Sequence, residues 1–547
     1  MKYMKKYFLI GSIFVFFGFL ILTNDLYQKI SKGIEIFGKT FKEISLNYVD
    51  EIDPEEFMLF GLKKMLLSLD PYTNFIEEDR ITDIEIITTG KYGGVGATVG
   101  LRNDRVIIVD LFEGYSAQRQ GLQIGDEIIK IDSTIISKDN FNDLGLYLKG
   151  EPGTEVTIIV KREGEVKDLN FVLVREQIEV KNLTYYGFIP ENTNNVYLKL
   201  SGFTRTAGDE IKKAIIELQK QKEIKSIILD LRGNPGGLLD AAIDVSDKFL
   251  KKDFVIVSVN QRDEQNNITY KANEEPIVGD INLIVLIDGS SASASEIVAG
   301  AIQDNDRGII LGTQSFGKGL VQTIITLPYN HSLKITTGKY LTPSGRCIQK
   351  IDYSSNNKVF INQNTLLKKE FYTRNNRLVY SAGGILPDTI VTNVLLSNQI
   401  NELIARGFFF RFASFYMNQN QNFNFEINND QELFKKFKEY IRNQKFEYTS
   451  KSELLLAELT TISNIENYNE KVKEKIQNLL DELKIQQEKE LDKFSSDVII
   501  EIKKELAYRQ FGRVGRITEG LKYDIQFTTA LNIINNENLY HKILRVE

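Results

Sequence analysis

The stretch LIVLIDGSSASASEIVAGAIQD, residues 283–304, decides the fold. It begins with an apolar run typical of a buried strand, turns at a glycine, passes four serines and continues with apolar residues at helical spacing. This order predicts a strand, a tight turn and a helix that begins at a serine. The N–H groups and dipole of a helix N-terminus favour a developing negative charge. Because Ser293 and Glu296 also match a capping box, this stretch alone predicts either a nucleophile or a cap.

The same alternation continues on both sides of this stretch. Strand patterns such as NVYLKL (195–200) and SIILDLR (226–232) are separated by amphipathic helical patterns from about residue 177 to residue 394. Strands that alternate with helices are typical of an α/β domain with a largely parallel sheet. We therefore expect residues 177–394 to form the α/β core.

Three further segments flank this core. Residues 24–90 have a helical pattern, and residues 91–176 carry short β runs separated by glycine turns, as in a compact β-rich module. Residues 395–547 are helical and highly charged, which predicts solvated helices with one apolar face. Dimerisation or docking of an adaptor protein through these helices remains an open alternative.

The N-terminus carries a membrane-targeting pattern. Lys2, Lys5 and Lys6 precede an uncharged apolar run from Tyr7 to Thr23, which as a helix covers roughly 25 Å. A cleaved signal peptide and a signal anchor both fit this pattern. Since no small-residue cleavage site follows, we expect residues 1–23 to be an uncleaved anchor and the rest of the chain to be exported. The alternative is a buried core helix.

Composition excludes several classes of function. The 547 residues suffice for three or four domains, and a net charge of −6 gives no basic excess for nucleic acid. One cysteine, Cys347, excludes an internal disulfide, and two histidines, His331 and His541, remove most zinc sites. We therefore expect no metal, no cofactor and no nucleic-acid partner.

A serine nucleophile needs a base. Neither histidine lies in a recognisable triad motif, whereas Lys318 lies between two glycines in FGKG, where burial would favour the neutral amine. Gln322 follows four positions later, an offset that keeps it on the same face of a strand or a helix as Lys318. The alternative for Lys318 is a solvated turn lysine.

Two glycine-rich segments complete the candidates. DLRGNPGG (230–237) lacks the G-K-[ST] of a phosphate loop, and YGGVGATVG (92–100) lacks the βαβ unit of a dinucleotide site. Their N–H groups could instead bind an anion or the C-terminal carboxylate of a peptide. Plain glycine turns are the alternative for both.

From LDPYTNF (69–75) to about Asp388, the chain resembles the C-terminal processing peptidases, the tail-specific serine endopeptidases of class S41. The C-terminal helical region is similar to the extension of Bacteroidota-type members. Tyr72 departs from a frequent histidine, and Cys347 from a serine. The resemblance is carried, in the family's order, by YGGVGATV, SAQRQGLQIGDEIIKID, ILDLRGNPGG, SASASEIVAGAIQD, FGKGLVQ, YLTPSGRCIQ and GGILPD.

The resemblance implies a multidomain α/β and β fold: the N-terminal anchor, a PDZ domain at 91–176, a crotonase/ClpP-like protease core and the helical C-terminal region. It also implies a nucleophile, Ser293, and a general base, Lys318, which Gln322 orients. The implied oxyanion donors are the N–H groups of Ala294 and of Gly236 or Gly237. The implied residues for binding a substrate tail in the PDZ domain are Gly94, Val95, Gly96 and Ala97.

The function implied is cleavage of unfolded or tail-exposed exported proteins with apolar C-termini, in the periplasm, by an enzyme anchored in a bacterial inner membrane. An adaptor protein and a homo-oligomer are further candidate partners. Two rival functions stay open at this point. One is a non-catalytic PDZ scaffold or chaperone that binds protein tails, and the other is a crotonase-type enzyme that acts on thioesters.

Overall fold

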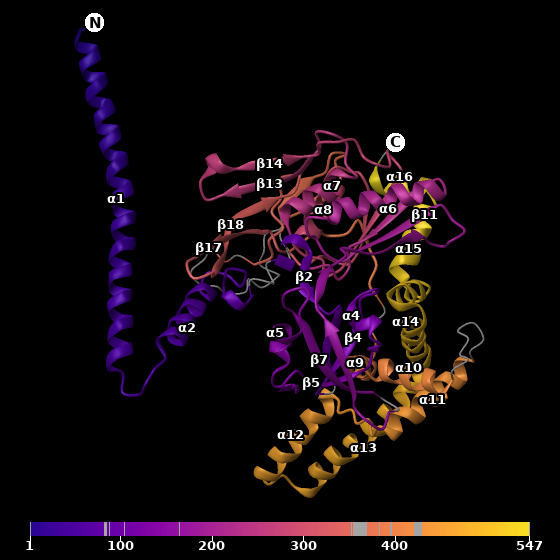
Figure 1. The fold of residues 1–547 in the computed structure, drawn as a ribbon. Helices are drawn as coiled ribbons and strands as arrows, with labels where there is room; N and C mark the ends of the chain where they lie inside the picture. Colours follow the sequence, from indigo (N-terminus) through magenta and orange to yellow (C-terminus); the bar gives the residue numbers. More distant parts are fainter. Residues whose placement is uncertain are drawn as a thin grey trace. The chain divides into compact units, whose positions relative to one another are not determined.

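The structure is a computed structural model with side chains, and it contains two compact units. One unit comprises residues 1–78 and 322–336, and the other comprises residues 79–321 and 337–547. Figure 1 shows the course of the chain within each unit. The described residues are 2–80, 85–86, 88–102, 104–162, 165–351, 353, 369–381, 383–393, 396–420 and 429–545, with only the helical course given for residues 2–24.

The first unit begins with helix α1 (Lys2–Asn47) and helix α2 (Pro54–Leu67). Asp53 accepts hydrogen bonds from the backbone nitrogens of Glu55 and Glu56, so an aspartate cap followed by proline starts α2. The predicted anchor, residues 1–23, lies outside the residues whose side chains are described. In the remaining, described part of the chain, no helix is long and apolar enough to cross a bilayer.

Within the helical region predicted for residues 24–90, the structure also contains a short strand. Strand β1 (Asn74–Ile76) follows α2 and pairs antiparallel with residues 332–334 of strand β18 (Ser332–Leu341). Pro71 and the side chain of Asp70, which accepts hydrogen bonds from Tyr72 and Thr73, turn the chain out of the helix. Short strands of this kind carry too little periodicity to be found in a sequence.

Residues 91–179 form the predicted β-rich module. Its antiparallel sheet has the order β3-β4-β5-β7-β8, with β6 at one side, and β2 pairs separately with β9. The module has its own apolar core, which includes Val106, Ile108 and Val160. Its elements are β2 (Lys91–Gly94), β3 (Ala97–Arg102), β4 (Arg105–Leu111), α4 (Ser116–Arg119), β5 (Glu127–Ile131), β6 (Thr134–Ile135), α5 (Leu144–Leu148), β7 (Glu155–Lys161), β8 (Leu169–Val174) and β9 (Glu176–Glu179).

The predicted α/β core contains a six-stranded sheet in the order β10-β11-β12-β15-β16-β21. Only β10 is antiparallel to its neighbour; the other pairs are parallel, as the alternating pattern predicts. The strands are β10 (Leu183–Phe188), β11 (Asn195–Leu200), β12 (Ser226–Asp230), β15 (Asn282–Ile287), β16 (Ile309–Gly312) and β21 (Thr389–Ile390).

Successive residues of these strands pack on opposite faces of the sheet. Ile227 and Leu229 contact the core under helices α6 (Ala207–Gln221), α7 (Leu239–Asp247) and α8 (Ala294–Asp304). A smaller antiparallel sheet also packs in this core, where β13 (Val255–Gln261) pairs with β14 (Ile268–Lys271) and with residues 338–341 of β18.

The opposite face of the sheet is covered by the end of the chain. Tyr197, Ile228 and Ile284 pack in one apolar cluster with Phe527 of helix α15 (Ile525–Ile534) and Tyr540 of helix α16 (Glu537–Leu544). Figure 1 shows these yellow helices beside β11. Helices α15 and α16 each have one apolar face, as predicted, and these faces form the third layer of the α/β core. Sequence alone did not reveal the partner of their apolar faces.

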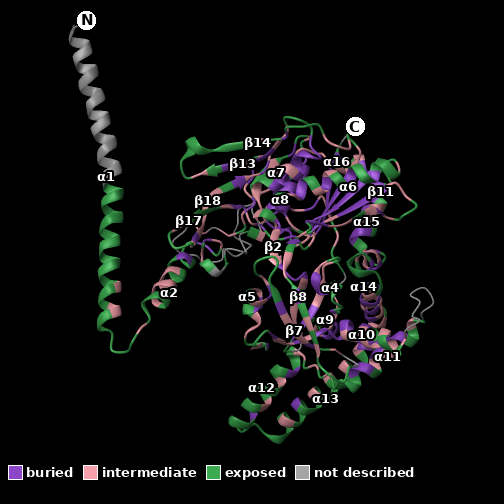
Figure 2. Ribbon diagram, in the orientation of Figure 1, coloured by how far each residue is buried: buried purple, intermediate pink, exposed green. Residues whose placement is uncertain are grey.

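The rest of the C-terminal region forms a helical body with an aromatic core that includes Phe408, Phe412 and Phe437. Helices α12 (Lys451–Ile465) and α13 (Glu470–Lys493) form a hairpin whose surface is mostly exposed, as predicted for solvated helices (Figure 2). The helices are α9 (Asn398–Ala405), α10 (Phe408–Gln419), α11 (Asp430–Asn443), α12 (Lys451–Ile465), α13 (Glu470–Lys493) and α14 (Ser495–Leu521).

Candidate active site

Two loops meet at the carboxyl edge of the parallel sheet. Strand β12 ends at Asp230 and its neighbour β15 ends at Ile287, so the loops that follow them lie side by side. The backbone nitrogen of Gly233 donates to Asp288 Oδ1 (3.0 Å), and that of Ala292 donates to the carbonyl oxygen of Asn234 (3.1 Å). The glycine loop 231–237 and the serine turn 288–293 thus form one hydrogen-bonded edge.

The four serines differ in what they contact. Ser291 Oγ donates to the carbonyl oxygen of Leu231, and Ser295 Oγ donates to that of Asn234, both at 2.9 Å, and both serines are buried. These two side chains connect the loops. Ser293 is only partly buried and lies directly before α8, where the predicted nucleophile belongs.

The backbone of Ser293 is strained. Its φ of 54° and ψ of −112° lie outside the regions that side chains with a Cβ ordinarily adopt. Such a conformation costs about 1–3 kcal/mol and persists only where surrounding contacts impose it. The strain points to a functional constraint at the turn between β15 and α8.

Glu296 supplies the contacts that connect Ser293 with Lys318. Its Oε2 accepts from the backbone nitrogens of Ser293 and Lys318 (2.9 Å each), and its Oε1 accepts from Gly317 N (2.7 Å) and Ser315 Oγ (2.6 Å). Glu296 is fully buried. The predicted capping glutamate therefore binds the start of its own helix and the lysine loop with one carboxylate.

Burial raises the pKa of Glu296 to about 7, although its four hydrogen bonds favour the charged form. The desolvation of the carboxylate thus outweighs its hydrogen bonds. Near neutral pH this carboxyl group gains or loses a proton, which changes the acceptors that it offers to the backbones of Ser293 and Lys318.

Tyr340 is a second link between the same segments. Its hydroxyl lies 2.7 Å from the carbonyl oxygen of Lys318 and 3.2 Å from that of Ser293, and the side chain is buried. Glu296 contacts the N–H groups of these two residues, and Tyr340 contacts their carbonyl groups. Together they fix the backbone on both sides of the predicted pair.

Lys318 itself is half-buried and lies in the loop that precedes strand β17 (Leu320–Thr326). The argument that Lys318 and Gln322 share one face of a strand is therefore wrong, because the strand begins after Lys318. Gln322 belongs to the other compact unit, where its Nε2 donates to Thr336 Oγ1 (3.3 Å). Its predicted role stays a prediction.

The oxyanion candidates differ in what their N–H groups already contact. Gly236 donates to Asn234 Oδ1 (2.9 Å), whereas neither Gly237 nor Ala294 donates to an acceptor in the described chain. Gly236 has a φ of +97° and lies against Ser293 and Ala294. The geometry therefore favours Gly237 over Gly236 as an oxyanion donor. Gly236, which lacks a side chain, instead allows the two loops to approach each other closely.

A buried ion cluster stands at the base of the glycine loop. Asp230 accepts from Tyr197 Oη (2.5 Å), from Lys199 Nζ (3.1 Å) and, with both oxygens, from the guanidinium of Arg232 (3.0 and 2.7 Å). Burial alone would raise the pKa of Asp230, but the Lys199 and Arg232 cations hold it well below its usual range. Asp230 is therefore ionised throughout the physiological range.

Three family profiles match this chain in succession. A PDZ domain profile matches residues 93–173, that of peptidase family S41 residues 194–358, and that of a probable PDZ-protease C-terminal helical domain residues 399–534. The chain is 37% identical over 354 residues to a carboxy-terminal-processing protease of Bartonella bacilliformis, covering 63% of this chain and 80% of that protein. The chain belongs to the S41 family of carboxy-terminal processing proteases.

The carboxy-terminal processing protease CtpB of Bacillus subtilis is also similar, at 30% identity over 320 residues, or 58% of this chain and 66% of that protein. By the family profile and these sequence relatives, the chain is a serine peptidase rather than the non-catalytic scaffold or the thioester enzyme. Among solved structures, a photosystem II D1 C-terminal processing protease aligns with a TM-score of 0.36 at 24% identity, covering 66% of this chain and 89% of that one. None of these comparisons tests the Bacteroidota-type resemblance.

In the PDZ domain of this protease, the four predicted tail-binding residues lie at one turn. Gly94 ends β2, Val95 and Gly96 form the turn, and Ala97 begins β3. The carbonyl oxygens of Val95 and Gly96 accept from Ala117 N and Phe112 N, whereas their own N–H groups donate to no acceptor in the described residues. This turn therefore has donors available for a carboxylate.

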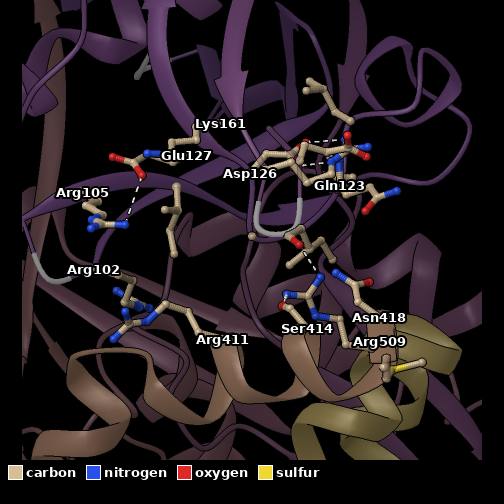
Figure 3. A pocket seen from close by; sticks show the side chains of 18 of the residues that line it. Arg102, Arg105, Gln123, Asp126, Glu127, Lys161, Arg411, Ser414, Asn418 and Arg509 are labelled. Carbon is tan, nitrogen blue, oxygen red and sulfur yellow. Dashed lines mark hydrogen bonds and ion pairs between the residues drawn. The ribbon is translucent and has the colours of Figure 1, made fainter. Parts of the chain in front are cut away.

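A separate cavity of about 590 Å³ lies between the PDZ domain and helices α10 and α14 (Figure 3). Several arginines line this cavity, among them Arg102, Arg105, Arg411 and Arg509. None of the predicted catalytic residues lines it. This arginine-lined cavity is therefore separate from the edge at Ser293.

The sequence does not predict three residues of this candidate site. It predicts only a capping role for Glu296, and it assigns no role to Tyr340 and Asp230, although both lie in motifs of the family. A glutamate three residues after the nucleophile is a local signal, but its contact with the lysine loop is not. Tyr340 gives no signal at all, since its role depends on a strand that returns to the site.

Proposed function

We propose that Ser293 is the nucleophile and Lys318 the general base of a serine endopeptidase that acts on proteins with exposed apolar C-terminal tails. The observation that supports this most is the shared carboxylate of Glu296, which binds the backbone of both residues. The strained turn at Ser293 and the unoccupied donors of Ala294 and Gly237 support the same assignment.

In the first half of the reaction, neutral Lys318 takes the proton of Ser293 Oγ as that oxygen attacks the scissile carbonyl carbon. The carbonyl oxygen becomes an oxyanion, which the N–H groups of Ala294 and Gly237 stabilise at the N-terminus of α8. The tetrahedral intermediate then breaks its C–N bond. The Lys318 ammonium donates its proton to the leaving amine, and an acyl ester remains on Ser293.

In the second half, water attacks the ester while Lys318 accepts its proton, and Ser293 recovers its own proton when the acid product leaves. Removing one donor from such an oxyanion hole typically costs on the order of a hundredfold to a thousandfold in rate. Gln322 enters this mechanism through its place in the motif G-K-G-x-V-Q alone, as the residue that orients the lysine.

The PDZ domain would bind the end of the substrate. A peptide that adds as a strand places its carboxylate at a turn with available N–H groups and its alternate side chains in apolar contact. The turn at Val95 and Gly96 offers such donors. The lysines and the apolar run of residues 2–23 support an anchor in the bacterial inner membrane, with the protease in the periplasm.

The test is cleavage of an unfolded protein with an apolar C-terminal tail. We expect the full chain to cleave it and Ser293→Ala and Lys318→Ala to leave it intact while still folded. Cleavage by Ser293→Ala at the rate of the unchanged chain would refute the mechanism.

A matched glycine pair tests the PDZ turn. Gly96 and Gly114 have similar positive φ values, but a methyl group at Gly96 would lie 2.3 Å from Tyr115 Cβ, whereas at Gly114 it would meet nothing within 4 Å. Gly96→Ala should raise KM for the tailed substrate and leave kcat intact, and Gly114→Ala should change neither. Equal effects of the two variants would contradict tail binding at this turn.

A further inference from the structure

The ion cluster at the glycine loop reaches beyond the S41 core. Arg232 Nη1 lies 2.7 Å from Oδ2 of Asp524 and donates to Gln526 Oε1 (2.8 Å). Asp524 and Gln526 lie at the start of α15, in the part of the chain that matches the C-terminal helical domain. The start of a C-terminal helix therefore contacts Arg232, the second residue of the loop 231–237.

Arg232 is held in place by two contacts and by burial. Asp230 binds its guanidinium, Lys199 Nζ donates to its carbonyl oxygen (2.7 Å), and only 11% of its side chain is exposed. Arg232 has no hydrogen bond to Ser293 in the described chain. Its influence on catalysis would have to pass through the backbone of the glycine loop.

That loop is bonded to the nucleophile turn at several points. Next to Arg232, Gly233 N donates to Asp288, and Leu231 N donates to the carbonyl oxygen of Leu286 (2.9 Å). Further along, the carbonyl oxygen of Asn234 accepts from Ala292 N and Ser295 Oγ. A shift of Arg232 would therefore strain these hydrogen bonds and disturb the fit between the loop that carries Gly237 and the turn at Ser293.

Asp524 uses its two oxygens for two tasks. Oδ1 caps α15 by accepting from Gln526 N (2.9 Å) and Phe527 N (3.0 Å), and Oδ2 binds Arg232. A cap needs only one acceptor, which asparagine supplies as well as aspartate. The ion pair is therefore separable from the cap by a single substitution.

We propose that Asp524 is a positioning residue of the peptidase reaction, through which the C-terminal helical region sets the position of Arg232 and of the oxyanion loop. This inference rests on the proposed function of Ser293 and Gly237. Asp230 and Asp524 balance the charges of Lys199 and Arg232. Without the Asp524 charge, one carboxylate faces two cations, and Arg232 loses its ion pair with Asp524.

The test uses the full chain and four variants. Asp524→Asn keeps the cap but turns an amide N–H₂ toward the guanidinium of Arg232. Asp524→Asn/Gln526→Glu returns a carboxylate to the neighbouring position, which already lies 2.8 Å from Arg232. Gln526→Glu alone measures the cost of losing the hydrogen bond that Gln526 Nε2 donates to the carbonyl oxygen of Val391 (2.7 Å). Asn536→Asp is the matched control, because Asn536 caps α16 in the same layer and is exposed. For each variant kcat, KM and the melting temperature are measured.

We expect Asp524→Asn to lower kcat about tenfold with KM unchanged, since small displacements of an oxyanion donor act on the transition state. The melting temperature should also fall, because the largely buried Arg232 loses one ion-pair partner. The double variant should recover part of the loss in kcat, and Asn536→Asp should match the unchanged chain. A kcat equal to that of the unchanged chain in Asp524→Asn would overturn the inference. So would a loss that follows the melting temperature and is not recovered by Gln526→Glu.

A different experimental result would refute the proposed function. If Ser293→Ala cleaved the substrate like the unchanged chain, the mechanism at Ser293 would fall, whatever Asp524→Asn did. If Ser293→Ala is inactive and Asp524→Asn is fully active, only the positioning role of Asp524 is refuted.

Discussion

The backbone nitrogens of Ser293 and Lys318 donate to the same atom, Oε2 of Glu296, each at 2.9 Å. The two residues lie on different loops, and neither loop belongs to a strand or a helix at that point. One buried carboxylate therefore sets the distance between the backbone of Ser293 and the backbone of Lys318. The proposed mechanism depends on such a contact, since proton transfer requires the two side chains within hydrogen-bond reach.

Glu296→Gln should lower kcat/KM by about a hundredfold. An amide keeps one acceptor oxygen, so its N–H₂ group would face either the N–H groups of Ser293 and Lys318 or those of Gly317 and Ser315 Oγ. The matched control is Glu453→Gln, since Glu453 is another buried glutamate of a capping box, in α12. Steady-state cleavage assays on both variants test this prediction. Equal losses of kcat/KM in the two variants would contradict a role specific to Glu296.

The stability of the protein should depend on pH through the same group. The pKa of Glu296 is raised from an ordinary value of 4.5 to about 7, so the folded protein binds an extra proton between these values. This stabilising contribution is complete below pH 4.5, falls as pH rises and is lost above about pH 7. At about 1.36 kcal/mol per pH unit it amounts to roughly 3 kcal/mol.

Urea unfolding of inactive Ser293→Ala across pH 4–8 measures this effect, and Ser293→Ala/Glu296→Gln supplies the reference. The difference between the two chains isolates Glu296 from Asp388 and Glu505, whose pKa values burial also raises. The difference in free energy of unfolding should change steadily between pH 4.5 and 7. A constant difference over that range would show that Glu296 does not titrate there.

Tyr340→Phe should reduce kcat about tenfold and leave KM unchanged. The substitution removes the hydroxyl next to the carbonyl oxygens of Lys318 and Ser293 but keeps the ring in place, so only the position of the two segments loses support. Tyr540→Phe is the control, because that buried hydroxyl bonds Leu283 at the amino end of β15, on the far side of the sheet from the site. It should lower stability without lowering kcat, and a matching kcat loss in both variants would refute the prediction.

Much of this site could be predicted from local patterns. The alternation of strands and helices predicted the sheet, and the strand, turn and helix order placed Ser293 before α8. Contacts between distant segments could not be predicted in this way. The apolar residues of α15 and α16 have the same spacing whether water or a sheet covers them. No local pattern near Asp524 predicts that it contacts Arg232. The face that a helix buries is decided by the tertiary fold, which no window of local sequence contains.

Gly236→Ala should abolish most of the activity, while Gly233→Ala should not. Both glycines have positive φ, +97° and +71°, so an alanine at either site costs roughly 1 kcal/mol in backbone strain. A methyl group at Gly233 would meet nothing within 4 Å. At Gly236 it would lie 2.6 Å from the carbonyl oxygen of Ala292 and 2.9 Å from the backbone nitrogen of Ala294, which must separate to admit it.

Comparing these two variants therefore separates the effect of backbone strain from the effect of forcing the two loops apart. Circular dichroism melting should show a similar small loss of stability from strain in both variants, with a larger loss in Gly236→Ala from the clash. Cleavage assays should show near-normal kcat for Gly233→Ala and at least a hundredfold lower kcat for Gly236→Ala, because the N–H of Ala294 is displaced from the oxyanion. If Gly236→Ala remained active, the loops would tolerate separation, and Ala294 could not be a fixed donor at this site.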